Sequence, residues 1–324
     1  MKKTIALLLS FAMLVACFSG VNYAEAKPKK QSTTVSTTET KKREITDKQR
    51  NRYYKSAAFI GNSLGLGQKY FFSRQGKNYL GNPKMLVRGC YSFYNDKHHC
   101  EKWMIHYNGR AMMAKNAVKA CGCDKVFINM GTNDFFYSGD RVFQDYKEYI
   151  KGIRKVNPDV IIFIESTVSV TSNRQGRNLN SRNIARLNQL MKEYCKEQRD
   201  MYFIDVSSKL HTKQGHLKNM YASDNYCHLT DSAYRIWTNE MIKYTDKLML
   251  KEADAKRAVR RAEKKKTKNT VKRAKKLVAK LDKSTLKKEL YKRTKAIVIK
   301  KKKKAKKKPR VTEPVTESTT QTTE

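Results

Sequence analysis

Two short segments of the chain carry the residue types that nucleophilic catalysis needs. Ser63 lies in the segment GNSL (61–64), directly after the apolar run 57–60, so its hydroxyl is expected on a strand-to-helix turn. His228 lies in the segment SDNYCHL (223–229), beside a carboxylate and just ahead of a helical pattern. A serine next to a histidine base can attack an acyl carbon, because the base removes the hydroxyl proton. We therefore predict Ser63 as the nucleophile and His228 as the general base.

Hydrogen-bond donors that suit an oxyanion follow two other apolar runs. Gly89 comes shortly after the run 85–87, and Asn133 lies in the segment GTND (131–134), after the run 126–130. A backbone N–H and a side-chain amide at such places can stabilise the negative charge that develops on a carbonyl oxygen under attack. Both residues are therefore candidates for an oxyanion hole.

The pattern of apolar runs predicts the elements that position these groups. Runs of strand length recur at residues 57–60, 85–87, 126–130, 160–164 and 201–206. Helical patterns fall between and after them, most clearly at residues 142–156, 181–198 and 231–250. Such alternation predicts parallel strands joined by crossover helices, hence a three-layer α/β/α sandwich with a central parallel sheet of about five strands. Catalytic groups are then expected at the carboxyl ends of the strands.

With these four segments in this order, residues 56–250 resemble the SGNH hydrolase superfamily, also called the GDSL esterases and lipases. One block alone is a weak signal, whereas four blocks in order at the ends of predicted strands are specific. The resemblance implies a flavodoxin-like fold and a serine esterase in which Ser63 attacks an ester carbonyl and His228 is the base. It also implies an oxyanion hole formed by the Ser63 amide, Gly89 and Asn133.

The sequence departs from the family pattern at two positions. Asn62 stands where the family usually has an aspartate, which removes a charge and is expected to keep the turn. In the last block the family's aspartate stands three residues before the histidine, whereas here Asn225 holds that position and Asp224 stands one residue earlier. We favour Asp224, brought to His228 by a one-residue bulge, because only a carboxylate stabilises the imidazolium electrostatically. In the alternative, Asn225 or a backbone carbonyl orients the ring of a Ser/His dyad.

Three other sequence patterns do not support a different catalytic site or a cofactor. The spacing Gly61-x-Ser63-x-Gly65 also matches the nucleophile elbow of α/β hydrolases, but that fold needs strands and an oxyanion loop before the serine, where this chain has only a polar spacer. No phosphate-binding glycine pattern is complete, so no cofactor is implied. The segment WMIHYNGRAMM (103–113) is interpreted as a core-facing helix rather than as the wall of a substrate groove.

Charge marks the domain organisation. The 324 residues include 70 Lys and Arg against 29 Asp and Glu, a formal net charge of +41. Residues 47–250 hold 33 basic and 18 acidic residues, whereas residues 251–310 hold 29 basic and 5 acidic ones. We expect the hydrolase domain over 47–250 and a helical or disordered Lys/Arg-rich extension over 251–310, whose thin apolar stripe cannot form an independent core. Residues 27–46 are predicted as a flexible spacer and the Thr/Glu-rich residues 311–324 as a disordered tail.

The N-terminal residues predict export. Two lysines precede the apolar run 5–18, which is too short to cross a bilayer, and residues 24–26 (AEA) form a small-x-small cleavage site. We therefore predict a signal peptide over residues 1–26; in the competing hypothesis, a lipobox-like LVAC segment anchors a lipid on Cys17.

Cysteines outside the signal are even in number, which in an exported chain permits disulfides in any of 15 full pairings. They are Cys90, Cys100, Cys121, Cys123, Cys195 and Cys227. A metal site built from His98, His99, Cys100, Cys121 and Cys123 would match no common zinc spacing, so we expect thiols or disulfides and no metal.

Together, location and resemblance predict an exported serine esterase acting on acyl esters, such as O-acetyl esters, of small-molecule, carbohydrate or cell-envelope substrates. We expect residues 251–310 to hold it at the envelope by binding anionic polymers or lipid headgroups, since nucleic acid is not the expected partner of an exported protein. Two alternatives stay open: a degenerate domain that tethers polyanions without turnover, and an O-acyltransferase in which a sugar hydroxyl replaces water. The substrate itself cannot be derived from the sequence.

Overall fold

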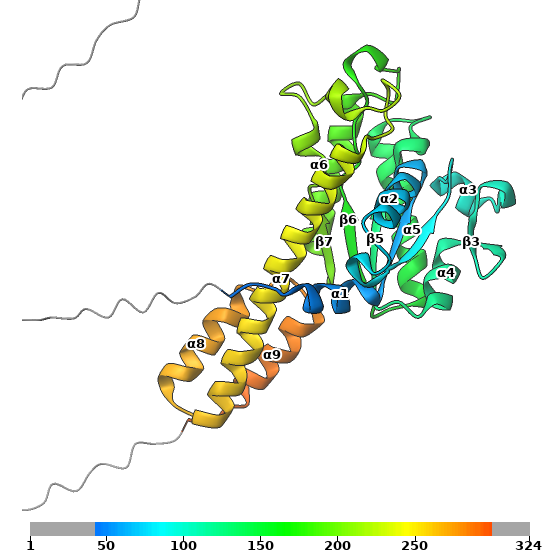
Figure 1. Ribbon diagram of the computed structural model, residues 1–324. Coiled ribbons are helices and arrows are strands. Elements are labelled where there is room, and N and C mark those ends of the chain that lie inside the picture. The colour runs from blue at the N-terminus through cyan, green and yellow to red at the C-terminus, as the bar shows by residue number, and fades with distance from the viewer. Residues whose placement is uncertain (1–42, 300–324) are drawn as a thin grey trace, which may run out of the picture. The chain divides into compact units, whose positions relative to one another are not determined.

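The computed structural model describes residues 43–299 (Figure 1). The predicted signal peptide, Cys17, most of the spacer and the residues from 300 onward lie outside this range. The strands are β1 (Ala57–Gly61), β2 (Lys84–Val87), β3 (Ile105–Tyr107), β4 (Arg110–Met112), β5 (Lys125–Asn129), β6 (Ile161–Glu165) and β7 (Met201–Ile204). The α-helices are α1 (Asp47–Lys55), α2 (Ser63–Arg74), α3 (Phe93–Lys97), α4 (Ala114–Cys121), α5 (Gly139–Val156), α6 (Ser181–Glu197), α7 (Asp231–Lys265), α8 (Lys268–Ala279) and α9 (Thr285–Lys295).

The five predicted strands form one parallel sheet in the order β2-β1-β5-β6-β7, so the predicted fold class is confirmed. In the order of the chain these strands are arranged 2-1-3-4-5, the flavodoxin-like order. Gly61 pairs with Val87 on one side and with Asn129 on the other. The residues that follow β1, β2 and β5 therefore meet at the same edge of the sheet.

Side chains of each central strand alternate between two hydrophobic cores, one on each face. Ala58 and Ile60 belong to the core that lies between the sheet and helices α4, α5 and α6. Ala57 and Phe59 belong to the core that lies between the sheet and helices α1, α2 and the N-terminal half of α7. On the second face the parallel register stacks a ladder of aromatic rings, with centroids 4.5 to 5.1 Å apart: Phe59, Phe127, Phe163 and Tyr202. Helices thus cover both faces of the sheet, as the three-layer prediction required (Figure 1).

The prediction of a helix over residues 103–113 is wrong. This segment forms a short 3-10 turn and then the antiparallel pair β3–β4, outside the main sheet. Asn108 and Gly109, with φ of 51° and 76°, lie at the tip of the hairpin. Positive φ at both central residues is what a type I′ turn requires, and asparagine followed by glycine supplies it at low cost.

The expected domain end at residue 250 falls inside α7, which continues without a break to Lys265. Residues 251–297 are helical over most of their length, and contrary to expectation they share a small core of nine buried residues. Four of these are alanines, whose small side chains let the three helices approach closely: Ala255, Ala258, Ala262 and Ala274. Among residues 43–299, no helix combines the length and the apolar character needed to cross a membrane.

The basic helices also contact the sandwich. Asp200, in the loop before β7, accepts hydrogen bonds from the backbone N–H of Thr285 at 2.9 and 3.1 Å, at the start of α9. The backbone N–H of Asp200 donates in turn to the carbonyl of Lys283 at 3.0 Å. Because Asp200 is buried, these bonds fix the turn between α8 and α9 to the domain.

Candidate active site

The structure brings Ser63, His228 and Asp224 into one hydrogen-bonded chain. Nε2 of His228 lies 3.0 Å from Oγ of Ser63, and Nδ1 of His228 lies 2.6 Å from Oδ2 of Asp224. The side chain of His228 is 47% exposed, so a substrate can reach the group. The carboxylate favours the tautomer with the proton on Nδ1, which leaves Nε2 free to accept the serine proton.

Local backbone structure places the serine. Asn62 caps α2, because its side-chain oxygen accepts a hydrogen bond from the N–H of Leu64 at 3.0 Å. The expectation that asparagine at this position keeps the turn is thereby confirmed. Ser63 is the first residue of α2, so its N–H has no acceptor within the helix and lies at the positive end of the helix dipole.

The loop around Asp224 contains the bulge that the displaced aspartate requires. Asn225 adopts φ of 56°, in the left-handed region, and its carbonyl accepts a hydrogen bond from Oγ1 of Thr171 at 2.8 Å. This turn lets Oδ1 of Asp224 accept the backbone N–H groups of Tyr226, Cys227 and His228 at 2.9 to 3.1 Å. Oδ2 remains for the ring of His228. The sequence left open whether Asp224 or Asn225 orients His228. In the structure the side chain that is hydrogen-bonded to His228 is that of Asp224.

The same hydrogen bonds determine the charge of Asp224. Partial burial raises the pKa of this carboxyl, but the hydrogen bonds from His228 and from the backbone outweigh burial and lower the pKa below its usual value. Asp224 is therefore ionised in the folded protein at neutral pH. An ionised partner is what stabilises an imidazolium during proton transfer.

The oxyanion candidates lie in neighbouring loops. Arg88 continues the pairing of β2 with β1 by donating its N–H to the carbonyl of Gly61 at 3.1 Å. This hydrogen bond places Gly89 at the edge of the sheet where Ser63 lies.

Asn133 is attached to the same loop. One N–H of the Asn133 side chain donates to the carbonyl of Tyr91 at 3.0 Å and thereby stabilises the loop that contains Gly89. The other N–H of that amide has no acceptor among the described residues. The assignment of Ser63, Gly89 and Asn133 to an oxyanion hole stays a prediction.

Asp134 and Thr171 are two contributors that the sequence did not single out. Asp134 is buried beside Asn133, and its Oδ1 accepts the N–H of Phe93 at 2.8 Å, which ties the GTND segment to α3. Burial raises the pKa of Asp134 to about 7, although the hydrogen bonds from α3 oppose this shift. The aspartate was visible in the GTND block, whereas no sequence signal pointed to Thr171.

The histidines and cysteines whose spacing was considered for a metal site do not bring their ligand atoms together among the described residues. There, the metal-ligand atoms that converge within 4.8 Å of one another belong to Asp224, Cys227 and His228. Both nitrogens of His228 are already engaged by Asp224 and Ser63. All six described cysteines carry free thiols, with the sulfur atoms of Cys121 and Cys123 2.7 Å apart.

A protein-family model matches part of the chain. Residues 98–236 match the model of the GDSL-like Lipase/Acylhydrolase family. The match includes Asn133, Asp224 and His228 but begins after Ser63, which the fold brings to His228. No curated protein matches the chain.

Three solved structures are examples of weak similarity to part of the chain. An acetyl esterase mutant with acetate ion is 14% identical, with a TM-score of 0.41, over 59% of this chain and 96% of that chain. A family 3 carbohydrate esterase from Clostridium thermocellum is 15% identical, with a TM-score of 0.41, over 58% and 94%. A G-D-S-L family lipolytic protein from Veillonella parvula is 15% identical, with a TM-score of 0.39, over 58% and 96%.

Proposed function

We propose that this chain, which carries a GDSL-like lipase/acylhydrolase domain of the SGNH esterase type, is an exported serine esterase that removes acyl groups, such as O-acetyl groups, from carbohydrate or cell-envelope substrates. The observation that carries the proposal is the continuous hydrogen-bonded chain from Asp224 through His228 to Ser63. A domain that only binds polyanions would not require Asp224, His228 and Ser63 to lie within hydrogen-bond distance of one another.

The proposed mechanism uses each residue once per half-reaction. Oγ of Ser63 attacks the ester carbonyl carbon while its proton moves to Nε2 of His228, and the oxyanion accepts hydrogen bonds from the Ser63 amide, Gly89 and Asn133. The carbon–oxygen bond to the alcohol then breaks, and the alcohol oxygen takes the proton from His228. A water molecule repeats the sequence on the acyl-enzyme and releases the carboxylic acid and free Ser63. Asp224 stays ionised and stabilises the imidazolium in both steps.

Reaction with a fluorophosphonate probe tests the nucleophile. We expect stoichiometric labelling of Ser63 in the wild-type protein and no labelling in Ser63→Ala. Hydrolysis of a short-chain aryl acetate should fall by about 10³-fold or more in that variant. Ser166, a buried serine whose hydroxyl already donates to Ser207 at 2.8 Å, offers the matched control Ser166→Ala, which should still be labelled. Labelling that persists in Ser63→Ala would contradict the assignment.

Envelope attachment is the second part of the proposal. Helices α8 and α9 border a hollow of about 750 Å³ lined by one arginine and five lysines, among them Lys275 and Lys288. Each lysine near an anionic surface contributes about 1 kcal/mol. This lining supports binding of anionic polymer or anionic lipid headgroups by the extension. Export is proposed from the N-terminal sequence alone, with cleavage after residue 26 favoured over a lipid anchor on Cys17.

Lysine neutralisation tests the attachment without cutting α7. Lys275→Gln with Lys288→Gln should weaken retention on vesicles of anionic phospholipid at about 100 mM salt. Lys69→Gln with Lys77→Gln removes the same charge from exposed positions elsewhere and is the control. Equal weakening by both pairs would mean that net charge alone, and not the α8–α9 surface, holds the protein.

A further inference from the structure

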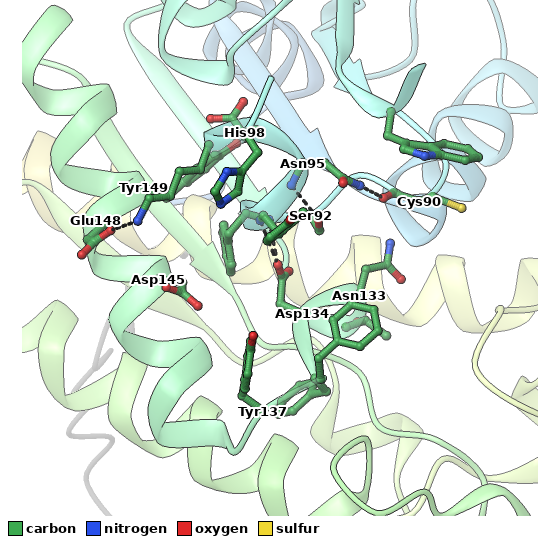
Figure 2. Close-up of a pocket in the computed structure, with 18 of the residues that line it drawn as sticks. Cys90, Ser92, Asn95, His98, Asn133, Asp134, Tyr137, Asp145, Glu148 and Tyr149 are labelled. Carbon is green, nitrogen blue, oxygen red and sulfur yellow. Dashed lines mark hydrogen bonds and ion pairs between the residues drawn. The ribbon is translucent and has the colours of Figure 1, made fainter. Parts of the chain in front are cut away.

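A large pocket lies beside the predicted oxyanion hole and has no role in the proton transfers. It encloses about 1240 Å³, within walls from α3, α5, the GTND segment and the loop that follows it. Asn133 and Cys90, the residue after Gly89, line it, whereas Ser63 and His228 do not. Figure 2 shows Asn133, Asp134, Asp145 and Tyr137 around the same hollow. An acetyl group would fill only a small part of this space, so the pocket fits another portion of the substrate.

Exposed aromatic rings gather at this pocket. Of the eight large hydrophobic side chains that are exposed among residues 43–299, three line it: Tyr94, Phe136 and Tyr137, which are 58%, 75% and 56% exposed. Trp103 also lines it, next to β3. His98 packs on Tyr94 with ring centroids 4.3 Å apart, and Arg141 lies over Tyr137, yet more than half of each of the three exposed residues faces solvent. Exposed rings gathered at one place indicate a binding surface.

Polar atoms without a partner lie deeper in the same wall. Oδ2 of Asp134 and Oγ1 of Thr132 are buried and make no hydrogen bond within the described residues. Both residues line the pocket and are only 5% and 6% exposed. A buried polar atom without a partner is unfavourable, so a ligand that brings hydroxyl groups gains from satisfying them.

Charge at the pocket contrasts with the rest of the protein. Three cationic residues, Lys97, Lys115 and Arg141, face four carboxyl groups in the lining. Lys97 pairs with Glu148 at 3.2 Å, and Arg141 approaches Asp145 at 3.6 Å. In a chain of formal net charge +41, this near-neutral wall does not favour an anionic ligand. The paired charges equally disfavour a long acyl chain, which needs a continuous apolar lining.

We propose that this pocket binds a neutral carbohydrate chain that carries the ester, with sugar rings stacked on Phe136, Tyr137 and Tyr94 and sugar hydroxyls bonded to Asp134 and Thr132. This inference rests on the proposed esterase function and adds the part of the substrate that the catalytic residues do not touch. The acyl carbon then lies at Ser63, and the sugar chain extends from there past Asn133 toward α5.

Two esters of the same acid separate this pocket from the chemistry. Phe136→Ala with Tyr137→Ala should lower kcat/KM for O-acetylated xylohexaose and cellohexaose by about 10-fold or more, because two stacking rings are lost. Turnover of an aryl acetate should stay within about 2-fold. Tyr70→Ala with Tyr291→Ala removes two rings of similar exposure outside the pocket and should change neither rate.

Binding of unacylated xylohexaose and cellohexaose to Ser63→Ala, measured by calorimetry, tests the pocket independently of turnover. We expect binding that is lost when Phe136→Ala and Tyr137→Ala are added. Equal loss on both esters, selective loss of an aryl laurate instead, or the absence of hexasaccharide binding would overturn the proposal. Hexasaccharide binding without any probe labelling of Ser63 would leave the pocket assignment intact and reject the esterase function.

Discussion

Glu165, the last residue of β6, makes the stability of this protein depend on pH. Its side chain is buried, and Oε1 accepts a hydrogen bond from Nε1 of Trp237, in α7, at 3.1 Å. Burial raises the pKa of Glu165 from 4.5 to about 8, and the hydrogen bond from Trp237 offsets only part of that shift. At neutral pH the folded protein therefore keeps a proton on Glu165 that the unfolded chain has released.

The sign of the effect follows from the order of the two pKa values. Because the folded-state pKa lies above the unfolded-state value, the free energy of unfolding falls as pH rises from about 4.5 to about 8. One pKa unit corresponds to about 1.4 kcal/mol, so the loss between pH 5 and pH 8 is about 3.5 kcal/mol. Glu165→Gln keeps an acceptor for Trp237 and cannot ionise, which removes the loss.

Denaturant unfolding of wild type and Glu165→Gln at pH 5, 6.5 and 8 measures this difference. The two proteins should be similarly stable near pH 5, and the variant should be more stable by about 3 kcal/mol at pH 8. Glu193→Gln, at an exposed position of α6, is the matched control and should follow the wild type at every pH. Asp134 titrates in all three proteins, so its contribution cancels. A constant offset between wild type and Glu165→Gln across the range would refute the reasoning.

Two further substitutions test the site and its support. Asp224→Asn should lower kcat for an aryl acetate by about 10³-fold or more, whereas Asn225→Gly, which suits the left-handed conformation, should stay close to wild type; the reverse order would favour Asn225 as the orienting residue. Gly67→Ala should destabilise the fold by about 1–3 kcal/mol in thermal or denaturant unfolding, because its Cβ would lie 2.0 Å from Oη of the buried Tyr234. Gly152→Ala in α5, whose Cβ would make only an ordinary van der Waals contact with Cδ of Lys115 at 3.8 Å, should be neutral or stabilising, and equal effects of the two alanines would contradict the packing argument.

The parallel sheet was predictable because buried strands appear as short apolar runs, and all five predicted runs became strands of the main sheet. The candidate site followed from the same pattern, since parallel strands bring their carboxyl ends to one edge. The hairpin at residues 105–112 was missed, although the Asn108-Gly109 pair signals a tight turn, because methionine and aromatic residues around it repeat at helical spacing. Tertiary contacts overrode that local pattern.

Two other features depend on geometry that no residue pattern contains. Whether Asp224 or Asn225 faces His228 depends on one backbone dihedral, the φ of 56° at Asn225. The core of the basic extension was missed because four of its nine buried residues are alanines, which count little in a hydrophobic stripe but allow close helix packing. The packing of that core also requires the turn at Lys266, where α7 ends and the chain reverses into α8.

The contrast between a near-neutral pocket and a basic extension separates catalysis from attachment in their response to salt. The contacts of the triad span 2.6 to 3.0 Å, shorter than the Debye length even at about 500 mM salt, where it is about 4 Å. Attraction between exposed lysines and an anionic surface acts over longer distances and is screened. Turnover of a neutral aryl acetate should therefore change little between about 50 and 500 mM salt, while retention on anionic vesicles falls steeply. Parallel salt dependence of both would show that the basic helices contribute to the chemical step, and the separation argued from the charge distribution would fail.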